Sequence, residues 1–239
     1  MSPALTLSDA DGPVGRYDRS EHDGHVYADL FEREAGVSPE RAARAVLDQL
    51  AGWRIAGDAA LGRELAAAGG RPLRHAHLMS RDLAERPQWR DPPGYRLTGV
   101  DRPAADLVDA YRAAFGPGHV DHRDEPRERS LAKLESHLSG SEFGPLLRGS
   151  GLAVTGDGAV AAAILLGTLP GDPPLNGPWV IEVFRHPAHR GVGRALFERA
   201  LALADASRLG LMVSEGNPAR GLYEALGFRL VHTALVVQL

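Results

Sequence analysis

A glycine turn between a strand pattern and a helix pattern is the part of this sequence best suited to chemistry. The apolar run Trp179–Phe184 predicts a buried strand, and Pro187 ends it because proline cannot donate to a sheet ladder. The turn Arg190-Gly191-Val192-Gly193-Arg194-Ala195 follows and leads into a helical pattern. Backbone N–H groups at a helix N-terminus lack partners within the helix and carry the positive end of its dipole. The turn therefore predicts a phosphate-binding site.

This turn differs from the two common nucleotide-binding loops. No lysine and no hydroxyl residue follows Gly193, as a P-loop would require. The dinucleotide fingerprint needs a third glycine and a suitably placed acidic residue downstream, and the sequence has neither. A phosphate-bearing ligand of another kind is expected.

The turn and a second motif together resemble the GNAT superfamily of acetyl-CoA-dependent N-acyltransferases. In that family an Arg/Gln-x-x-Gly-x-Gly/Ala signature wraps the pyrophosphate of coenzyme A, and Arg190, Gly193 and Ala195 fill its fixed positions. The second motif follows at the family's usual distance, as Asn217, Ala219, Leu222-Tyr223-Glu224 and Leu226-Gly227-Phe228. Because two motifs occur in the right order with a strand pattern between them, the resemblance is specific, and it covers residues 95–239.

The resemblance implies a fold and a set of cofactor-binding residues. We expect an α/β (α+β) GNAT fold, a mixed and mostly antiparallel twisted sheet with splayed central strands, flanked by helices. In the family, free backbone groups of the strand before the turn pair with pantetheine. Arg185 departs from the pattern, which has a β-branched apolar residue there. The implied cofactor-binding residues for acetyl-CoA, the expected co-substrate, are Val183, Phe184, Arg185, Arg190, Gly191, Val192, Gly193, Arg194, Ala195, Asn217 and Tyr223.

Acetyl transfer from a thioester to an amine needs proton transfer at both ends. An alkylamine has a pKa of about 10.4, so a base or a water chain must remove its proton at neutral pH. Glu182 is the candidate base, and a salt bridge to a nearby arginine is the alternative role. Tyr223 is the candidate acid for the leaving thiolate, although an aromatic on this helical face can also be a core residue. Asn217 fits both a helix N-cap and a contact to the cofactor.

Composition sets limits on the function. The chain has 239 residues, of which 44% are hydrophobic and 24% charged, and it has no cysteine. Disulfides, thiolate metal sites and a cysteine nucleophile are therefore excluded, and no metal is expected. A net charge of −4 without a basic tail argues against nucleic acid as a partner. No apolar run reaches the roughly 20 residues that span a bilayer, so we expect no membrane segment and a cytoplasmic location.

The basic residues are unevenly distributed in type and position. Lys133 is the single lysine among 27 basic residues, a bias that we attribute to genome composition. Four arginines gather near the glycine turn and suit a polyphosphate ligand, while a solvated helix face with Glu198 as a partner is the alternative. These arginines are Arg185, Arg190, Arg194 and Arg199.

The first part of the chain is expected to be a separate half. Residues 1–24 are polar and lack periodicity, which predicts a loose or extended arm. A helical pattern follows from Val26 to about Leu50, with Ser38 and Pro39 as its cap. Aligning Gly69 with Gly227 without a gap gives the same helix–strand–helix–strand order in both regions, although chance could produce this match. Residues 25–90 are thus interpreted as a degenerate GNAT-like half, joined through the proline-rich residues 84–94 to a GNAT domain over 95–239.

The remaining pattern of the second domain predicts the side that receives the acceptor. We expect a strand from Tyr95, helices over 103–115 and 127–139, a hairpin over 151–167 and a proline-rich loop over 168–178. In the GNAT family the first two helices and the loop joining them border the acceptor site. Residues 116–126 form that loop here, and His119, Asp121, His122 and Asp124 are its candidates for contact with a polar acceptor.

The sequence therefore predicts an N-acetyltransferase that moves an acetyl group from acetyl-CoA to a primary amine of a small molecule or peptide. A catalytically silent acyl-CoA-binding sensor or scaffold is the alternative, and a purely structural α/β module is disfavoured by the presence of both motifs. The acceptor, the acyl chain length and the oligomeric state, including a homodimer, are not determined by the sequence.

Overall fold

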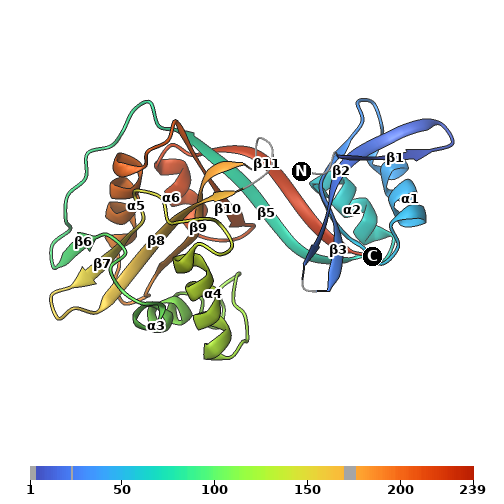
Figure 1. Ribbon diagram of the computed structural model, residues 1–239. Coiled ribbons are helices and arrows are strands. Elements are labelled where there is room, and N and C mark those ends of the chain that lie inside the picture. Colours follow the sequence, from blue (N-terminus) through green and yellow to red (C-terminus); the bar gives the residue numbers. More distant parts are fainter. Residues whose placement is uncertain (1–3, 23, 170–175) are drawn as a thin grey trace. The chain divides into compact units, whose positions relative to one another are not determined.

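The computed structural model describes residues 4–22, 24–169 and 176–239, and contacts within the chain divide it into two units (Figure 1). Unit 1 comprises the residues up to Leu78 together with Leu230–Leu239, and unit 2 comprises Met79–Arg229. Two strands, β5 (Arg71–Asp82) and β11 (Arg229–Gln238), contribute residues to both units. The division therefore does not coincide with the boundary expected within residues 84–94.

Unit 1 combines a sheet with two helices. The elements confined to it are β1 (Leu5–Asp9), β2 (Gly12–His22), β3 (His25–Arg33), α1 (Pro39–Gln49), β4 (Arg54–Asp58) and α2 (Ala59–Ala67). Its strands lie in the order β1-β2-β3-β4-β11-β5. β3 and β4 are parallel, whereas β11 pairs antiparallel with β4, with Val237 opposite Ile55. Both of these residues are fully buried, so the last strand of the chain completes the core of unit 1.

The described part of residues 1–24 is a pair of strands, not the expected arm. Leu7, Val14 and Tyr17 are buried, and the ring of Tyr17 stacks on Phe31 with the centroids 6.0 Å apart. These strands have so few apolar side chains facing the core that the sequence shows no alternation of apolar and polar residues. Their position is set by pairing with strands from elsewhere in the chain. The helix expected from Val26 begins only at Pro39, because β3 precedes it.

Unit 2 contains both motifs. Its elements are β6 (Tyr95–Thr98), α3 (Ala104–Ala114), α4 (Arg127–Ser139), β7 (Gly151–Thr155), β8 (Val160–Leu169), β9 (Gly177–Arg185), α5 (Val192–Leu203), β10 (Arg208–Ser214) and α6 (Ala219–Ala225). The strands lie in the order β10-β9-β8-β7-β6, in which β9 and β10 are parallel and the other pairs are antiparallel. The expected hairpin is β7–β8, while residues 170–175 of the expected proline-rich loop lie outside the described residues.

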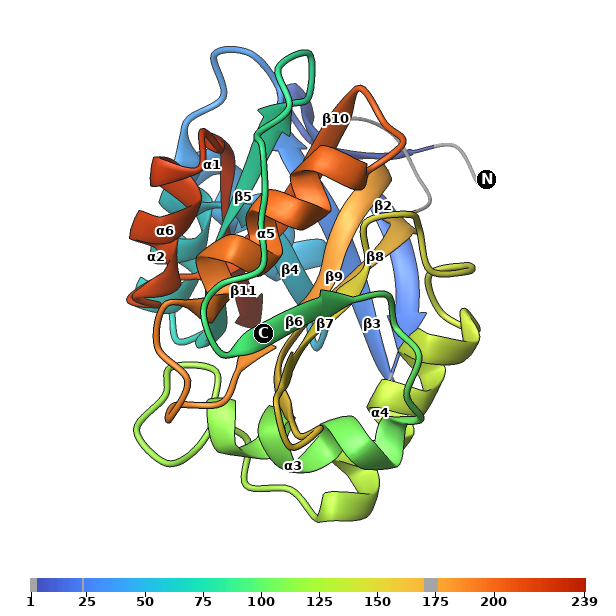
Figure 2. The same cartoon turned by 90° about the vertical axis from the view of Figure 1, so that its left-hand side faces the viewer.

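Alternating side chains of the sheet in unit 2 serve two different cores. Ala162 and Ile164 of β8 belong to the core beneath α5 and α6, whereas Ala163 and Leu165 belong to the core beneath α3 and α4. Figure 2 shows α5 on one side of β6–β9 and α3 and α4 on the other. Because β8 is covered on both faces, it consists almost entirely of buried residues, most of them apolar.

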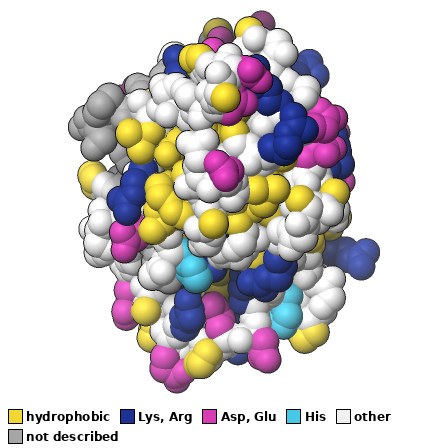
Figure 3. All heavy atoms as spheres, turned by 90° about the vertical axis from the view of Figure 1, so that its right-hand side faces the viewer, with side chains coloured by type: hydrophobic (Ala, Val, Ile, Leu, Met, Phe, Trp, Pro, Cys, Tyr) yellow, Lys and Arg dark blue, Asp and Glu magenta, His cyan; other side chains and the backbone are white. Residues whose placement is uncertain are grey.

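The predicted repeat of element order is present. α1-β4-α2-β5 and α5-β10-α6-β11 are both helix–strand–helix–strand sequences. The second helix of each set is followed by a glycine with positive φ, Gly69 at 103° and Gly227 at 83°. Within the described residues no helix is long and apolar enough to cross a bilayer. On the face drawn in Figure 3, hydrophobic side chains gather near the centre, and most of the basic and acidic side chains lie around them.

Candidate cofactor and catalytic site

A cavity of about 410 Å³ in unit 2 is lined by residues of both motifs. It lies between the end of α3 and its following loop, β9, the first turns of α5 and the beginning of α6. The predicted cofactor-binding residues that line it are Val183, Phe184, Arg185, Gly193, Asn217 and Tyr223. Motifs that are separate in sequence thus meet at one cavity.

One wall of this cavity is a strand edge that has lost its neighbour. β9 pairs with β10 only at Trp179 and Val180, whereas its pairing with β8 continues to Arg185. At that end the N–H of His186 donates to Ala161 of β8. In an antiparallel pair the direction alternates, so Val183 and Arg185 direct their N–H and C=O groups away from β8. The central strands are splayed as predicted, and the free edge can pair with an extended ligand as another strand would.

The glycine turn forms the second wall. Gly191 has a φ of 83° at the N-cap of α5, which favours glycine, and no side chain caps this helix. The first-turn N–H groups are therefore available to a ligand. Gly193 has no positive φ, and a Cβ atom added there would only meet Cδ of Arg185 at 3.8 Å, an ordinary contact. The fold therefore does not require glycine at position 193. A ligand lying directly against the backbone would require it, because a side chain there would be in the way.

Two arginines of the predicted basic cluster lie beside the turn. Arg185 lines the cavity, and its Nη1 donates to the carbonyl oxygens of His186 at 3.0 Å and Pro187 at 3.1 Å. Its guanidinium is thereby held against the loop that precedes α5. Arg190 is exposed next to Gly191.

The other two arginines of the cluster point elsewhere. Arg199 lies on a later turn of α5, with its guanidinium carbon 5.4 Å from the centroid of Trp89 and Nη1 3.3 Å from the carbonyl oxygen of Ser150. Burial lowers its pKa. Arg194, not Arg199, pairs with Glu198, at 2.9 Å. The predicted four-arginine cluster is thus only partly present at the turn.

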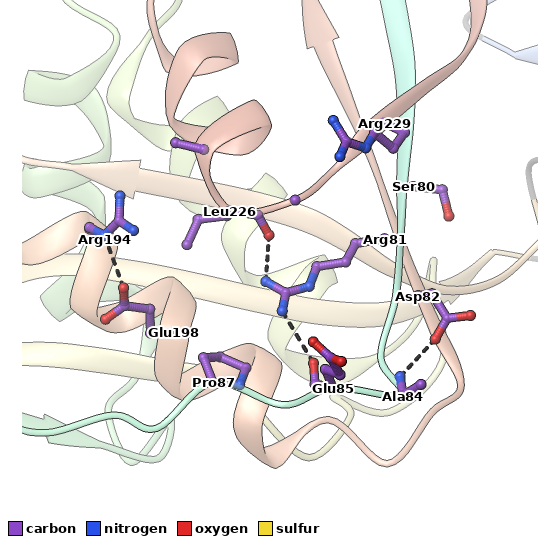
Figure 4. A pocket seen from close by; sticks show the side chains of 12 residues that line it. Ser80, Arg81, Asp82, Ala84, Glu85, Pro87, Arg194, Glu198, Leu226 and Arg229 are labelled. Carbon is purple, nitrogen blue, oxygen red and sulfur yellow. Dashed lines mark hydrogen bonds and ion pairs between the residues drawn. The ribbon is translucent and has the colours of Figure 1, made fainter.

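Arg194 instead lines a second pocket of about 660 Å³, drawn in Figure 4. There Arg81 donates to the carbonyl oxygens of Leu226 and, at 3.2 Å, Glu85. The predicted cofactor contact of Arg194 can therefore come only from its backbone. Val192 is buried in the core and Ala195 is half-buried against it, so these two can also contribute only N–H groups.

Tyr223 is both a core residue and a cavity residue. It is 6% exposed and packs against Phe197, with ring centroids 5.3 Å apart, and against Phe228. Within the described residues its hydroxyl makes no hydrogen bond. Burial, followed by the charges of Glu182 and Asp121, raises the pKa of Tyr223. The phenol is therefore protonated at neutral pH and able to donate into the cavity.

Asn217 precedes α6, and its side chain links the start of this helix to the loop after α3. Its Oδ1 accepts from the N–H of Ala219 at 2.9 Å, and its Nδ2 donates to Asp121 at 2.9 Å. Ser214, at the end of β10, also donates to Asp121. The side-chain amide is consequently engaged within the protein.

His119 is the residue of this loop that lines the cavity. Its Nδ1 accepts from the backbone N–H of Asp121 at 3.0 Å, and its ring meets Phe115 edge to face with centroids 5.1 Å apart. A ring whose Nδ1 accepts must carry its proton on Nε2 when neutral. His119 can thus donate a hydrogen bond from Nε2. His122 instead lies 2.7 Å from the carbonyl oxygen of Phe115 through its Nδ1 and is not part of the lining.

Glu182 forms an ion pair, but with lysine and not with arginine as considered from the sequence. Its Oε2 lies 2.7 Å from Nζ of Lys133, and its Oε1 accepts from the N–H of Val183 at 3.2 Å. Burial raises the pKa of Glu182, and Lys133 opposes that rise. The sequence attributes Lys133 to composition alone. That it is the single lysine of the chain is a signal, but the sequence does not indicate its partner.

The apolar lining residues were also missed as site residues. Phe115, Leu196 and Leu222 line the cavity, and their helical spacing indicated only that they face a core. No spacing rule distinguishes an apolar residue that packs against a neighbour from one that faces a ligand.

Several solved structures are similar to this chain over nearly its whole length. A GCN5-related N-acetyltransferase from Sphaerobacter thermophilus has a TM-score of 0.63 at 18% identity, covering 99% of this chain and 80% of that one. A tandem GNAT protein from the clavulanic acid biosynthesis pathway has a TM-score of 0.51 at 16% identity, covering 97% and 80%. A GCN5-related N-acetyltransferase from Kribbella flavida has a TM-score of 0.52 at 15% identity, covering 94% and 85%. No protein-family model and no curated protein matches the sequence.

These likenesses agree with the geometry of unit 2. A mixed sheet whose central strands part ahead of a glycine turn is the arrangement that the two motifs predicted. The chain therefore has the fold of the GCN5-related N-acetyltransferases, the GNAT fold.

Proposed function

We propose that this protein is an N-acetyltransferase that moves an acetyl group from acetyl-CoA to a primary amine of a small molecule or peptide. The observation that carries the proposal is the single cavity that brings together a free strand edge, an uncapped helix N-terminus and an unpartnered tyrosine hydroxyl. Each of these features is available to a ligand, and together they match an extended thioester that ends in a diphosphate.

The backbone would hold the thioester. The N–H and C=O groups of Arg185 and the C=O group of Val183 would pair with the pantetheine, since the N–H of Val183 already donates to Glu182. N–H groups of the turn from Gly191 to Ala195 would bind the diphosphate. The fold has room for a Cβ atom at position 193, so packing does not explain the glycine there. Close approach of the diphosphate to the backbone would explain it. The exposed guanidinium of Arg190 would add charge beside the turn.

Tyr223 and Glu182 would handle the protons. Glu182 accepts one proton from the ammonium group of the acceptor, and the neutral nitrogen then bonds to the acetyl carbon. As the C–S bond breaks, Tyr223 gives its proton to the leaving sulfur and later regains one from solvent. The nitrogen loses its second proton to solvent, and Glu182 also releases the proton that it took up, so the complete reaction releases one proton.

The acceptor would enter past the loop of residues 116–126. His119 lines the cavity from this loop and offers a hydrogen bond from Nε2. Asp121 cannot serve the acceptor freely, because Ser214 and Asn217 already occupy its carboxylate. We propose that the loop sets which amines are accepted, with His119 as the residue that touches them.

Thiol release from acetyl-CoA in the presence of a panel of primary amines tests this function. For any amine that is turned over, Tyr223→Phe is expected to lower kcat by about 10- to 100-fold. Tyr95→Phe is the matched control, because Tyr95 bonds His189 and does not line the cavity. Absence of thiol release with every amine would contradict the proposal, as would a Tyr223→Phe variant with the wild-type rate.

One observation favours the alternative of a catalytically silent acyl-CoA-binding sensor. The candidate base Glu182 is 9% exposed and already paired with a cation. If this pairing prevents Glu182 from taking a proton, the site could still bind acetyl-CoA but would not turn it over. Calorimetry separates the two functions. Tight binding of acetyl-CoA without thiol release on any amine supports the sensor, whereas turnover of any amine excludes it.

We further propose that unit 1 is a degenerate GNAT-like half. Its support is the repeated element order, the parallel pair β3–β4 that corresponds to β9–β10, and the likeness to a tandem GNAT protein over 97% of this chain. Unit 1 lacks a counterpart of Tyr223, because the gapless alignment places Leu65 there, and Leu65 is fully buried. Acetyl-CoA titration should therefore reveal one binding site per chain, and two sites would contradict this proposal.

A further inference from the structure

The single lysine of the chain lies against the candidate base. Nζ of Lys133, on α4, is 2.7 Å from Oε2 of Glu182 on β9. The side chain of Glu182 is 9% exposed and that of Lys133 is 44% exposed, so the pair reaches from the core to the surface. A contact this short between a buried carboxylate and an ammonium group is a charge-assisted hydrogen bond.

A tyrosine holds the ammonium group in place. Nζ of Lys133 is 3.0 Å from the hydroxyl oxygen of Tyr111 and 5.2 Å from the centroid of its ring. Tyr111 is itself fixed, because its ring meets Phe184 edge to face with centroids 5.5 Å apart. Phe184 lines the cofactor cavity, so this arrangement adjoins the site already described.

The residue type is informative in this chain. Every basic residue other than Lys133 is arginine, so composition favours arginine at this position as well. An ammonium group is compact and sits at the end of a flexible stem, whereas a guanidinium is a planar fork that binds a carboxylate best through two parallel hydrogen bonds. Here the cation contacts only Oε2 of Glu182, while Oε1 accepts from Val183. The geometry therefore suits lysine.

The groups that face Glu182 act in opposite directions on its charge. Burial and the charge of Asp121, from the loop after α3, favour the neutral carboxyl group. Lys133 and the N–H of Val183 favour the carboxylate. Tyr223, on α6, is neutral and feels the charge of Glu182. Lys133 is thus the one cation among these groups, and without it a buried carboxylate would have no counter-ion.

We propose that Lys133 is a positioning residue that keeps Glu182 ionised and oriented, so that Glu182 can take a proton from the acceptor amine. The inference rests on the proposed function. A carboxylate can accept this proton only if it carries none beforehand. The fixed charge of Lys133 also disfavours a second cation nearby, which promotes loss of the proton from an incoming ammonium group.

Infrared spectroscopy of the full chain at neutral pH tests the charge state without an acceptor. The carboxylic acid band of Glu182, identified by its loss in Glu182→Gln, should be absent in the wild type and present in Lys133→Met. It should be absent again in Lys133→Met/Glu182→Gln and in Lys133→Arg. Arg129→Met is the matched control, since it removes an exposed cation from the same helix. A band in the wild type, or none in Lys133→Met, would overturn the proposal.

Kinetics with any amine that is turned over test the catalytic consequence. Loss of Lys133 raises the proton affinity of Glu182, so the acidic limb of kcat/KM should move to higher pH. The rate at neutral pH should fall about tenfold, and Lys133→Arg should keep the limb near its wild-type position. An unmoved limb with a uniform loss of rate would show a merely structural role and overturn the proposal. Lys133→Gln serves as a second variant if Lys133→Met folds poorly in thermal unfolding.

The two tests separate the failure of this inference from failure of the proposed function. If no amine is turned over, the N-acetyltransferase proposal fails, while the infrared bands still decide whether Lys133 sets the charge of Glu182. If turnover is found and Lys133→Met matches Arg129→Met in its pH profile, the inference fails and the function stands.

Discussion

Asn217 and Asp121 are hydrogen-bonded to each other at 2.9 Å, although 96 residues separate them in the chain. The first turn of α6, which carries the second motif, is thereby fixed to the loop after α3, which lines the other side of the cavity. The spacing between Tyr223 and His119 across the cavity thus depends on one carboxylate.

Replacing that carboxylate should loosen the site. We expect Asp121→Ala to lower the free energy of unfolding by about 1–3 kcal/mol, because Ser214 and Asn217 each lose a charged partner. Urea denaturation measures this change. Asp124→Ala, at an exposed position of the same loop, is the control and should stay within about 0.5 kcal/mol of the wild type. Equal values for the two variants would contradict this prediction.

The two glycines of the turn should respond differently to alanine. Gly193→Ala should fold with nearly wild-type stability, since its Cβ meets only Arg185 at an ordinary distance, yet it should weaken acetyl-CoA binding. Gly191→Ala should lower the unfolding free energy by about 1 kcal/mol, because φ is 83° there. Calorimetry and urea denaturation of both variants check this. Unchanged affinity in Gly193→Ala would argue against close approach of a diphosphate.

Arg86 should be worth more to stability than its exposed position suggests. The last turn of α5 has no basic residue of its own, and Arg86 donates to the carbonyl oxygens of Ala202, Ala204 and Ala206 at that end. Arg86→Ala should lower the unfolding free energy by about 1–2 kcal/mol, because carbonyl groups at a helix C-terminus favour a cation. Arg90→Ala, exposed in the same segment, should have no measurable effect in the same denaturation assay.

His137 should make folding sensitive to acid. Burial, with Lys133 as a smaller cause, lowers the pKa of His137 to about 4, below its ordinary value of about 6.5. The unfolded chain therefore binds this proton more readily, so stability is unaffected above pH 7 and falls between about pH 6.5 and 4. The loss should reach about 3 kcal/mol.

Urea denaturation at several pH values measures this effect as a difference from His137→Phe, which cannot bind the proton. The advantage of the wild type over the variant should shrink as the pH falls through that range. His232→Gln, at a partly exposed position, should run parallel to the wild type. A constant difference between the wild type and His137→Phe would show that the buried ring does not titrate in this way.

The sequence predicts the elements around the turn because their signals are local. β9, α5, β10 and α6 each carry an apolar period, a proline or a glycine that marks their limits. The predicted cavity residues Val183, Gly193, Asn217 and Tyr223 follow from motif positions within those elements, and the structure brings them together.

Pairing across the fold could not be predicted in the same way. Nothing within ten residues of Lys133 indicates that its partner is Glu182, because that contact depends on how α4 crosses β9. The strands β1 and β2 show the same limitation. Val14 is buried because β2 pairs with β3, and these strands have too few apolar residues to form a recognisable alternating pattern. Proximity in sequence places Arg199 near the turn, but its position on a later turn of α5 directs its side chain toward Trp89.

The antiparallel pairing of β11 with β4 affects the order of events during synthesis. Residues 234–238, which lie opposite Arg54–Asp58, follow the whole of unit 2 in the chain, so they are translated after it. On the ribosome β4 must therefore wait with an open strand edge until unit 2 has been made. Nascent chains stalled shortly before residue 230 should expose that edge to chaperones, whereas chains that have passed residue 239 and left the ribosomal tunnel should have closed it.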